Sequence, residues 1–442
     1  VYATRANLRL FRFDFDGAIA DYERAIELNP NYAMAYLWYG RLMISRDPER
    51  SLSLYRQALE LDPRSPLIHV NIAHHLERAG EYEEALKGYQ RAVEIDPGFA
   101  VGYGAIARLY EDVFGRPDEA IHLAERAVAS DPGNLGLRLS LGSRLQNRGR
   151  FDDALEVFRE TIDLDPGFVR AYRAIADLHL VRGRLDEAIR WNHEAHQRDP
   201  SNPEPLFWLA ALYALLADEA SGRLWLTRLR EAEEGDFWSG VAQAVIHARR
   251  GELAKFEAMF RERAPLLPGG SRKWIFGFDL EAGNYDAILE REAKFEPGLF
   301  EDPPQVNFGN VEGALRVGAA LAGRGDHPRA ERMLGKCEEF LQGLDEGTRR
   351  ARFPDLLGNV YLHQGRNDEA LTEWRIAFER GFRHDDPGAY VTMAAGWVTS
   401  SLLDPLRDDP RLRALLDDTS ADLDRQRRAL AREGLAITEP SF

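Results

Sequence analysis

Cysteine and long apolar runs are nearly missing from this 442-residue sequence. Its only cysteine, Cys337, excludes an intrachain disulfide framework and a zinc site built from cysteines. The longest unbroken apolar run is Leu206 to Ala217, whereas a membrane-spanning helix needs about 20 such residues. An initiator methionine and a signal-like segment are both absent at Val1. We therefore expect a fragment or a processed form, from which a signal peptide or an upstream domain could have been lost.

An excess of positive charge is also missing. The 57 Lys and Arg residues are outnumbered by 73 Asp and Glu residues, which gives a formal net charge of −16. Binding to phosphate backbones or anionic membranes needs a positive footprint, so this composition argues against a general nucleic-acid or membrane binder. The 44% hydrophobic content is enough for a sizeable core. The acidic charge and the lone thiol favour the cytoplasm and leave the periplasm open.

One phrase recurs along the first half of the chain. An acidic residue is followed by Ala-Leu or Ala-Ile, an aromatic residue, a small residue and finally Asp-Pro or Asn-Pro. The closing prolines of six copies are 33, 34, 35, 34 and 34 residues apart: Pro30, Pro63, Pro97, Pro132, Pro166 and Pro200. A fixed period near this length predicts an array in which each repeat is one supersecondary unit.

Each period predicts two amphipathic helices. In the third copy, Ile72 and Leu76 share one face of the first helix, and Ala85 and Tyr89 share one face of the second. Gly80 lies between them, where a residue without a side chain can end the first helix.

This pattern resembles the tetratricopeptide repeat. Two distant copies match it as well, with Val317, Gly318, Leu321, Ala330, Leu334 and Cys337 in one and Leu357, Gly358, Tyr361, Ala370, Trp374 and Ala377 in the other. Cys337 then occupies a place where the family has a small buried residue, so we expect it to pack in the core. The resemblance implies an all-α, right-handed superhelical solenoid of about eleven helix pairs with a short helical C-terminal cap.

Four parts are expected along the chain. Residues 1–202 form a regular array, 203–300 degenerate helix pairs, 301–385 further pairs, and 386–442 a C-terminal helical cap or tail. Stretches with proline and glycine at 265–271 and 296–310 are the expected breaks in the stack. The second is a long connector, a subdomain boundary or a lid-like loop, and a plain connector is favoured.

The tail carries a second resemblance. The phrase DPLRDDPRLRALL lies in a region, roughly 355–430, that is similar to the closing segment of certain bacterial signalling proteins. In those proteins a tetratricopeptide array follows a nucleotide cyclase, a kinase or a winged-helix DNA-binding domain. The resemblance implies that this chain is the regulatory half of such a protein. The basic run Arg425–Arg432 is expected to be an exposed helix end that pairs with the chain's own carboxylates.

The family resemblance also implies that the first helix of each pair lines an inner groove. Counting back from each closing proline gives two apolar rows and one basic row on these helices. The predicted contact residues are Met34, Leu37, Arg41, Leu67, Val70, Asn71, His74, Val101 and Arg108. Such a groove suits an extended peptide with apolar anchors and an acidic group, or an amphiphilic small molecule. Two alternatives stay open: a register shift would place these side chains in the core, and the chain's own end, 435–442, would fill the groove.

The leading hypothesis is a non-catalytic interaction scaffold with a protein or peptide partner. The alternative is a carrier that encloses a lipid-like molecule. It is motivated by the apolar rows and by aromatic residues of the middle region: Phe207, Trp208, Trp225, Phe237, Trp238, Trp274 and Phe276. The sequence leaves the oligomeric state open.

Motifs for catalysis or metal binding are not found in the sequence. His193 and His196 share one helix face, but zinc needs three or four protein ligands, so a helix–helix packing pair is expected. The segment Gly269–Lys273 has a faint likeness to a phosphate loop but lacks the GxxxxGK[ST] spacing, and it is expected to be a linker. We therefore expect no enzyme, no cofactor and no metal.

Overall fold

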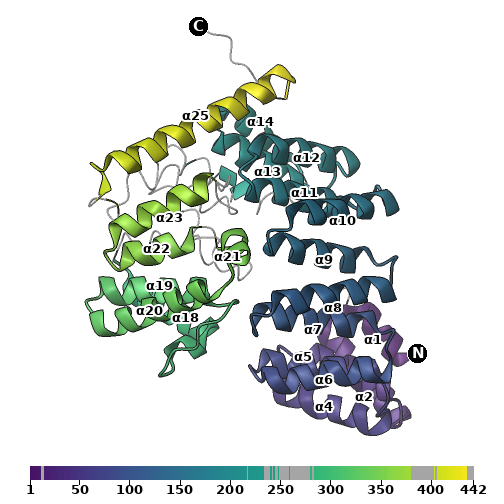
Figure 1. The fold of residues 1–442 in the computed structure, drawn as a ribbon. Helices are drawn as coiled ribbons and strands as arrows, with labels where there is room; N and C mark the ends of the chain where they lie inside the picture. Colours follow the sequence, from purple (N-terminus) through teal and green to yellow (C-terminus); the bar gives the residue numbers. More distant parts are fainter. Residues whose placement is uncertain are drawn as a thin grey trace. The chain divides into compact units, whose positions relative to one another are not determined.

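The described part of the chain is helical throughout. The computed structural model describes residues 1–10, 14–216, 218–232, 239–240, 242–243, 247, 258, 279–280, 283–353, 355–379, 403 and 406–435. These residues contain 21 α-helices and one 3-10 helix, and none of them lies in a β-strand (Figure 1). The predicted all-α class is confirmed. The break expected at 265–271 lies outside the described residues, and so does most of the stretch 233–282 within the degenerate region expected at 203–300.

Contacts along the chain divide it into two compact units, Val1–Arg144 and Leu145–Phe442. In the first unit successive helices pack against one another as pairs, α1 with α2 through α7 with α8. Its helices are α1 (Tyr2–Leu10), α2 (Phe15–Leu28), α3 (Ala33–Met43), α4 (Pro48–Leu61), α5 (Pro66–Arg78), α6 (Tyr82–Ile95), α7 (Ala100–Asp112) and α8 (Pro117–Ser130). Helix α9 (Leu135–Asn147) crosses the boundary.

Helices α5 and α6 show why the repeat phrase folds into a pair. Gly80 follows α5 with a φ of 81°, a backbone conformation that residues with a Cβ rarely adopt. The glycine therefore lets the chain reverse within a few residues. Ala73 on α5 and Ala85 on α6 are both fully buried, and they share one hydrophobic cluster with Tyr89. Small side chains at these positions let the two helices approach closely. The helix break predicted at Gly80 is confirmed.

The second unit contains the remaining described elements. They are α10 (Phe151–Leu164), α11 (Val169–Val181), α12 (Leu185–Arg198), α13 (Pro203–Leu215), α14 (Glu219–Glu231), α18 (Tyr285–Phe295), the 3-10 helix η3 (Pro297–Phe300), α19 (Val311–Gly323), α20 (His327–Gly343), α21 (Glu346–Arg352), α22 (Leu356–His363), α23 (Asn367–Glu379) and α25 (Pro410–Arg432). Helix packing continues in pairs, with α11 against α12, α13 against α14, α19 against α20 and α22 against α23.

Helix α25 joins two hydrophobic clusters of the second unit. Leu412 and Leu415, near its beginning, belong to the cluster of α18 to α23. Leu423 and Leu430, further along, belong to the cluster of α12 to α14. The helix contacts both α23 and α12 accordingly (Figure 1). The last described helix therefore packs on two parts of the array that are far apart in sequence.

The C-terminal helix is longer than the sequence predicts. We expected a short cap with a basic helix near its end, but α25 has 23 residues and is the longest helix in the described chain. It begins early because Pro410 suits the first helical position and Asp409 accepts a hydrogen bond of 2.8 Å from the backbone of Arg411. The helix also packs over much of its length, whereas a cap needs only to cover the last repeat.

The basic run of α25 pairs with the chain's own carboxylates, as predicted. Arg425 forms an ion pair with Asp422, and Arg427 forms one with Asp424, each at 2.6 Å and one helical turn away. These local pairs neutralise part of the basic run.

Candidate partner-binding surfaces

A band of apolar and basic side chains lies on the first helices of three consecutive repeats in the first unit. We call it the first-helix surface, and it comprises Met34 and Arg41 of α3, Leu67, Val70 and His74 of α5, and Val101 and Arg108 of α7. Val101 is 51% exposed, Arg41 and His74 are exposed, and the others are half-buried. Helix α3 contacts α5, and an ion pair joins α5 to α7. The structure therefore brings seven of the nine predicted residues to one surface.

The remaining two predicted residues, Leu37 and Asn71, differ from the others. Leu37 is fully buried in a cluster with Tyr55 and Ile68, because α3 turns this side chain toward its neighbouring helices. It is a core residue and not a contact residue, as the register alternative allows. Asn71 is half-buried, and its side-chain amide donates a 2.7 Å hydrogen bond to the carbonyl of Leu67 one turn earlier.

The charge of Arg108 is neutralised within the surface. Its guanidinium donates two hydrogen bonds to the carboxylate of Glu77, the second of them 2.7 Å long, and the hydroxyl of Tyr89 donates to the same carboxylate at 2.7 Å. Burial alone would raise the pKa of Glu77, but the hydrogen bonds from Arg108 and Tyr89 outweigh it and lower that pKa. The pair ties the first helices of two repeats together, so we assign it a structural role first.

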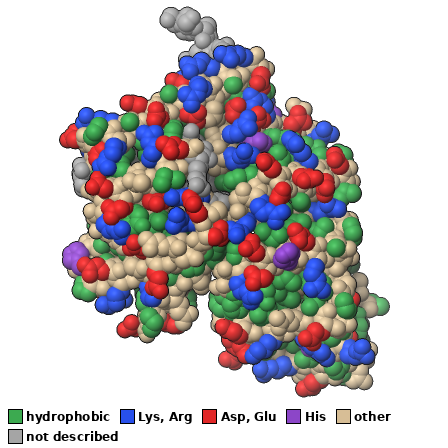
Figure 2. All heavy atoms as spheres, in the orientation of Figure 1, with side chains coloured by type: hydrophobic (Ala, Val, Ile, Leu, Met, Phe, Trp, Pro, Cys, Tyr) green, Lys and Arg blue, Asp and Glu red, His purple; other side chains and the backbone are tan. Residues whose placement is uncertain are grey.

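Positive charge remains around His74. Partial desolvation of its ring lowers the pKa of His74 although the residue is exposed, and the positive charges of Arg108, Arg78 and Arg41 lower that pKa further, whereas Glu77 opposes them. Within the described residues no carboxylate forms an ion pair with Arg41. On the face of the molecule shown in Figure 2, acidic and basic side chains are interspersed. Arg41 is thus the cation of the first-helix surface that has no ion-pair partner among the described residues, and the lowered pKa favours the neutral form of His74 beside it.

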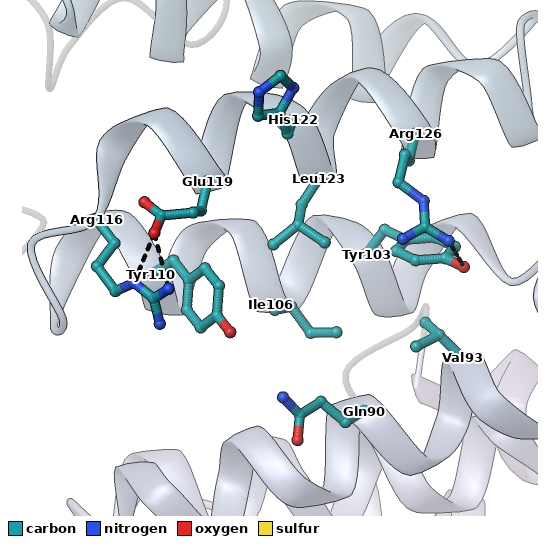
Figure 3. Close-up of a pocket in the computed structure, with 10 residues that line it drawn as sticks. All are labelled: Gln90, Val93, Tyr103, Ile106, Tyr110, Arg116, Glu119, His122, Leu123 and Arg126. Atoms are coloured by element: carbon teal, nitrogen blue, oxygen red, sulfur yellow. Dashed lines mark hydrogen bonds and ion pairs between the residues drawn. The ribbon is translucent and has the colours of Figure 1, made fainter.

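A pocket opens on the second helices of the same unit. We call it the second-helix pocket; its volume is about 420 Å³. Helix α7 forms its floor, while α6 and α8 form its sides (Figure 3). It is lined by Gln90 and Val93 of α6, Tyr103, Ile106 and Tyr110 of α7, and Glu119, His122, Leu123 and Arg126 of α8, with Arg116 just before α8.

Helix α7 contributes opposite faces to the two surfaces. Each residue advances an α-helix by about 100°, so Val101 and Arg108 lie within about 20° of each other. Tyr103, Ile106 and Tyr110 lie about 140–200° away from Val101 by the same count. The pocket floor and the first-helix surface are therefore separated by the thickness of one helix.

Each end of the second-helix pocket holds an arginine stacked on a tyrosine. The Arg116 guanidinium lies 4.6 Å from the ring centre of Tyr110 and is hydrogen-bonded to Glu119 at 2.7 and 3.0 Å. At the other end, the Arg126 guanidinium lies 4.5 Å from the ring centre of Tyr103 and donates a 2.8 Å hydrogen bond to its hydroxyl (Figure 3). Such stacking holds a guanidinium in place without neutralising it.

Sequence reasoning missed the second-helix pocket. Tyr103, Ile106 and Tyr110 follow the i, i+3, i+7 spacing of a buried helix face, which alone indicates core packing. The available signal was the presence of Arg116 just before the following helix and of Arg126 on it, two cations that the stripe could hold.

The histidines of α12 act as packing residues. The ring of His193 is hydrogen-bonded to the Tyr213 hydroxyl at 2.9 Å, and both His193 and His196 contact the face of Trp225 edge-on. The predicted helix–helix role of this pair is confirmed. Within the described chain, no group of three or more His, Cys, Asp or Glu side chains is placed to hold a metal ion. None of the helices searched combines the length and hydropathy needed to cross a bilayer.

The aromatic residues that motivated a lipid carrier lie in the core where the structure describes them. Phe207 and Trp225 are buried in the cluster of α12 to α14, and Trp208 packs against it. The other four, Phe237, Trp238, Trp274 and Phe276, lie outside the described residues. Of the tail proposed to fill the groove, only Leu435 is described; it packs against the same cluster, and its carbonyl accepts a hydrogen bond from Tyr213.

Comparison with known families identifies the repeats. A family profile described as a tetratricopeptide repeat matches residues 4–43 and 139–203, and a second profile with that description matches residues 42–109. These segments therefore carry tetratricopeptide repeats. They include all seven residues of the first-helix surface and the α7 residues Tyr103 and Ile106 of the pocket.

Curated relatives and solved structures match parts of the chain. The chain is 31% identical over 103 residues to small glutamine-rich tetratricopeptide repeat-containing protein 2 of Mycosarcoma maydis, covering 23% of this chain and 28% of that protein. It is 26% identical over 155 residues to the DnaJ homolog subfamily C member 7 homolog of Schizosaccharomyces pombe, covering 30% and 32%. This chain thus spans less than a third of the length of both curated relatives. A solved tetratricopeptide repeat protein from Parabacteroides merdae matches with a TM-score of 0.43 and 16% identity, over 56% of this chain and 97% of that one.

Proposed function

We propose that this chain is a non-catalytic interaction scaffold that binds an extended protein segment on its first-helix surface. Tetratricopeptide repeats generally mediate protein–protein interactions, and the repeats matched here include α3 and α5 entirely. The observation that carries the proposal is that one surface of the repeats exposes both Val101 and the unpaired Arg41. An extended segment that crosses these repeats can bury its apolar side chains on Val101 and be oriented by a carboxylate at Arg41.

The chemistry of the surface defines the segment. Its apolar side chains would cover Val101 and the exposed parts of Met34 and Leu67. A carboxylate of the segment would approach Arg41, because Arg108 is already engaged by Glu77. The proposed ligand is therefore a stretch in which Leu, Ile or Val residues alternate with Asp or Glu.

Two more specific hypotheses from the sequence, a signalling role and a lipid carrier, have less support. The assignment of the chain as the regulatory half of a bacterial signalling protein rests on the sequence likeness of residues 355–430 alone. The lipid carrier has no support from Phe207 and Trp225, because both are core residues. We therefore retain peptide binding as the function to test.

A displayed library of random peptides, selected against the full chain, tests the proposal. We expect the enriched peptides to combine acidic and aliphatic residues. One enriched peptide is then titrated into wild-type protein and into a variant with Arg41→Glu and Val101→Asp. Because the variant removes a favourable charge and an apolar contact, we expect binding to weaken by about tenfold or more.

Arg56→Glu is the matched control. Arg56 lies exposed on α4, a second helix, so this change alters the net charge as Arg41→Glu does without touching the surface. Unchanged binding by the Arg41→Glu, Val101→Asp variant, or equal weakening by Arg56→Glu, would show that the segment does not bind there.

A further inference from the structure

The second-helix pocket contains an arginine whose usual partner is missing from its repeat. Six residues before the closing proline, three copies have an arginine: Arg24, Arg91 and Arg126. The first two pair with a glutamate one turn later, Glu27 at 2.8 Å and Glu94 at 3.1 Å. In the third copy that position is Ala129.

Arg126 therefore lacks the carboxylate that engages Arg24 and Arg91. Within the described residues no carboxylate forms an ion pair with Arg126. Its guanidinium stacks on Tyr103 at one end of the pocket and donates to the tyrosine hydroxyl. A guanidinium has five N–H donors, and the tyrosine hydroxyl uses one of them. The others can serve an anion in the pocket.

The rest of the pocket is suited to an apolar body. Ile106 and Leu123 lie between the two stacked tyrosines, and Val93 lines the pocket near the Tyr103 end (Figure 3). Tyr103 and Tyr110 are two helical turns apart, about 10 Å along α7. The volume of about 420 Å³ falls in the range of small-molecule sites.

We propose that the second-helix pocket binds a small apolar carboxylic acid. Its carboxylate pairs with Arg126 and its hydrocarbon or aromatic body lies on Ile106 and Leu123. The ligand is a small molecule, because the arginine–tyrosine stacks at both ends limit its length to about 10 Å, whereas an extended peptide would run past them. This site goes beyond the proposed function, since it lies on the other face of α7 and uses none of the residues of the first-helix surface.

Isothermal titration of the full chain with 4-phenylbutyrate tests the proposal. This probe has a carboxylate, an apolar body and a length that matches the pocket. The uncharged amide of the same acid is the ligand control. A blocked peptide that ends in a free phenylalanine carboxylate supplies the same groups from a polypeptide. We expect saturable binding of the acid, with the amide at least about tenfold weaker, because charge-assisted hydrogen bonds to the carboxylate are lost.

Two variants test the role of Arg126, one by removing its charge and the other by giving it a carboxylate partner. Arg126→Gln removes the cation, and Ala129→Glu restores the glutamate that pairs with the equivalent arginines Arg24 and Arg91. Position 129 is exposed, so this second change leaves the pocket walls intact. We expect both variants to weaken the acid by about tenfold. Arg91→Gln is the matched control, because it removes the equivalent arginine of the preceding repeat, and it should bind as wild type does.

The proposal fails if 4-phenylbutyrate does not bind, if its amide binds equally well, or if Ala129→Glu and Arg126→Gln retain wild-type affinity. Binding of the peptide acid without binding of 4-phenylbutyrate would also overturn it, because the site would then serve a polypeptide end. Thermal unfolding of each variant shows whether a loss of affinity reflects a loss of fold.

Discussion

Arg190 on α12 and Glu433, directly after α25, form an ion pair with two hydrogen bonds of 2.7 Å across 243 residues of sequence. Next to this pair, Gln426 donates a 2.8 Å hydrogen bond to the carbonyl of Gly183 and accepts one of 3.2 Å from the backbone of Asp186. The end of α25 is therefore fixed to the turn and first residues of α12 by polar contacts on top of its apolar packing.

Leu430→Ala should detach this end of α25. The side chain of Leu430 is fully buried in the cluster of α12 to α14, so its truncation leaves a cavity and should cost about 2–5 kcal/mol of unfolding free energy. Urea unfolding measures the change. The exposed neighbour Arg432, changed to alanine, is the control and should have little effect. Equal stability of the Leu430→Ala variant and wild type would mean that α25 does not pack on α12 in solution.

Glu111→Gln should destabilise the first unit strongly. Glu111 on α7 and Arg144 on α9 form a 3.0 Å ion pair with side-chain exposures of only 3% and 9%. Removing the carboxylate leaves a buried guanidinium poorly compensated, which typically costs about 3–5 kcal/mol. Chemical denaturation checks the loss. The exposed pair Arg24–Glu27 provides the contrast, because Glu27→Gln should cost less than about 1 kcal/mol. Similar costs for the two variants would contradict the burial of the Arg144 pair.

Acid should weaken the fold before its carboxylates titrate. Burial, followed by nearby positive charges, lowers the pKa of His179 and of His193 to about 4. Below pH 6.5, the ordinary histidine value, the unfolded chain takes up protons that the folded chain refuses. Stability should therefore fall as pH drops from about 6.5 to about 4, by about 1.4 kcal/mol per pH unit for each histidine.

Urea midpoints across this pH range measure the slope. The variant His179→Gln should have a shallower slope than wild type, because one titrating group is removed. His122 is exposed and serves as the control position, so His122→Gln should keep the wild-type slope. An unchanged slope in His179→Gln would exclude His179 as a source of acid sensitivity.

Cys337 should be inert toward thiol reagents in the folded protein. Its side chain is fully buried, and burial raises the pKa of the thiol to about 12, so almost no thiolate forms near neutral pH. A chromogenic thiol assay should give no rapid reaction in native buffer and one equivalent per chain in denaturant. Rapid labelling without denaturant would show that the α19–α20 pair opens readily.

The two proposed sites on α7 should respond to separate changes. Arg126→Gln should leave peptide binding at the first-helix surface unchanged, and Val101→Asp should leave 4-phenylbutyrate binding unchanged. Calorimetric titration of both ligands into both variants checks this. A variant that weakens both ligands equally has lost the fold of α7, and circular dichroism would detect that loss.

The repeat could be predicted from the sequence because its signals are local. Gly80 and the spacing of Ala73, Ala85 and Tyr89 determine the helix pair without reference to the rest of the chain. Leu37 was assigned wrongly because neighbouring positions on a helix differ by about 100°, and a small error of register moves a side chain from surface to core.

The second-helix pocket and the contacts of α25 could not be predicted in the same way. Ala129 becomes informative only once Arg126 is seen to point at Tyr103. The pairing of Arg190 with Glu433 depends on residues far apart in the chain, and each of them alone is an ordinary charged residue on a helix.

The position of α25 also affects the order in which the protein becomes complete during synthesis. Repeats that contact only their neighbours can fold one after another as the chain leaves the ribosome. Helix α12 cannot complete its packing in that way, because part of its apolar surface is covered by residues that are synthesised more than two hundred positions later. Until those residues are made, this apolar part of α12 stays uncovered on the nascent chain, where it is open to association with other proteins.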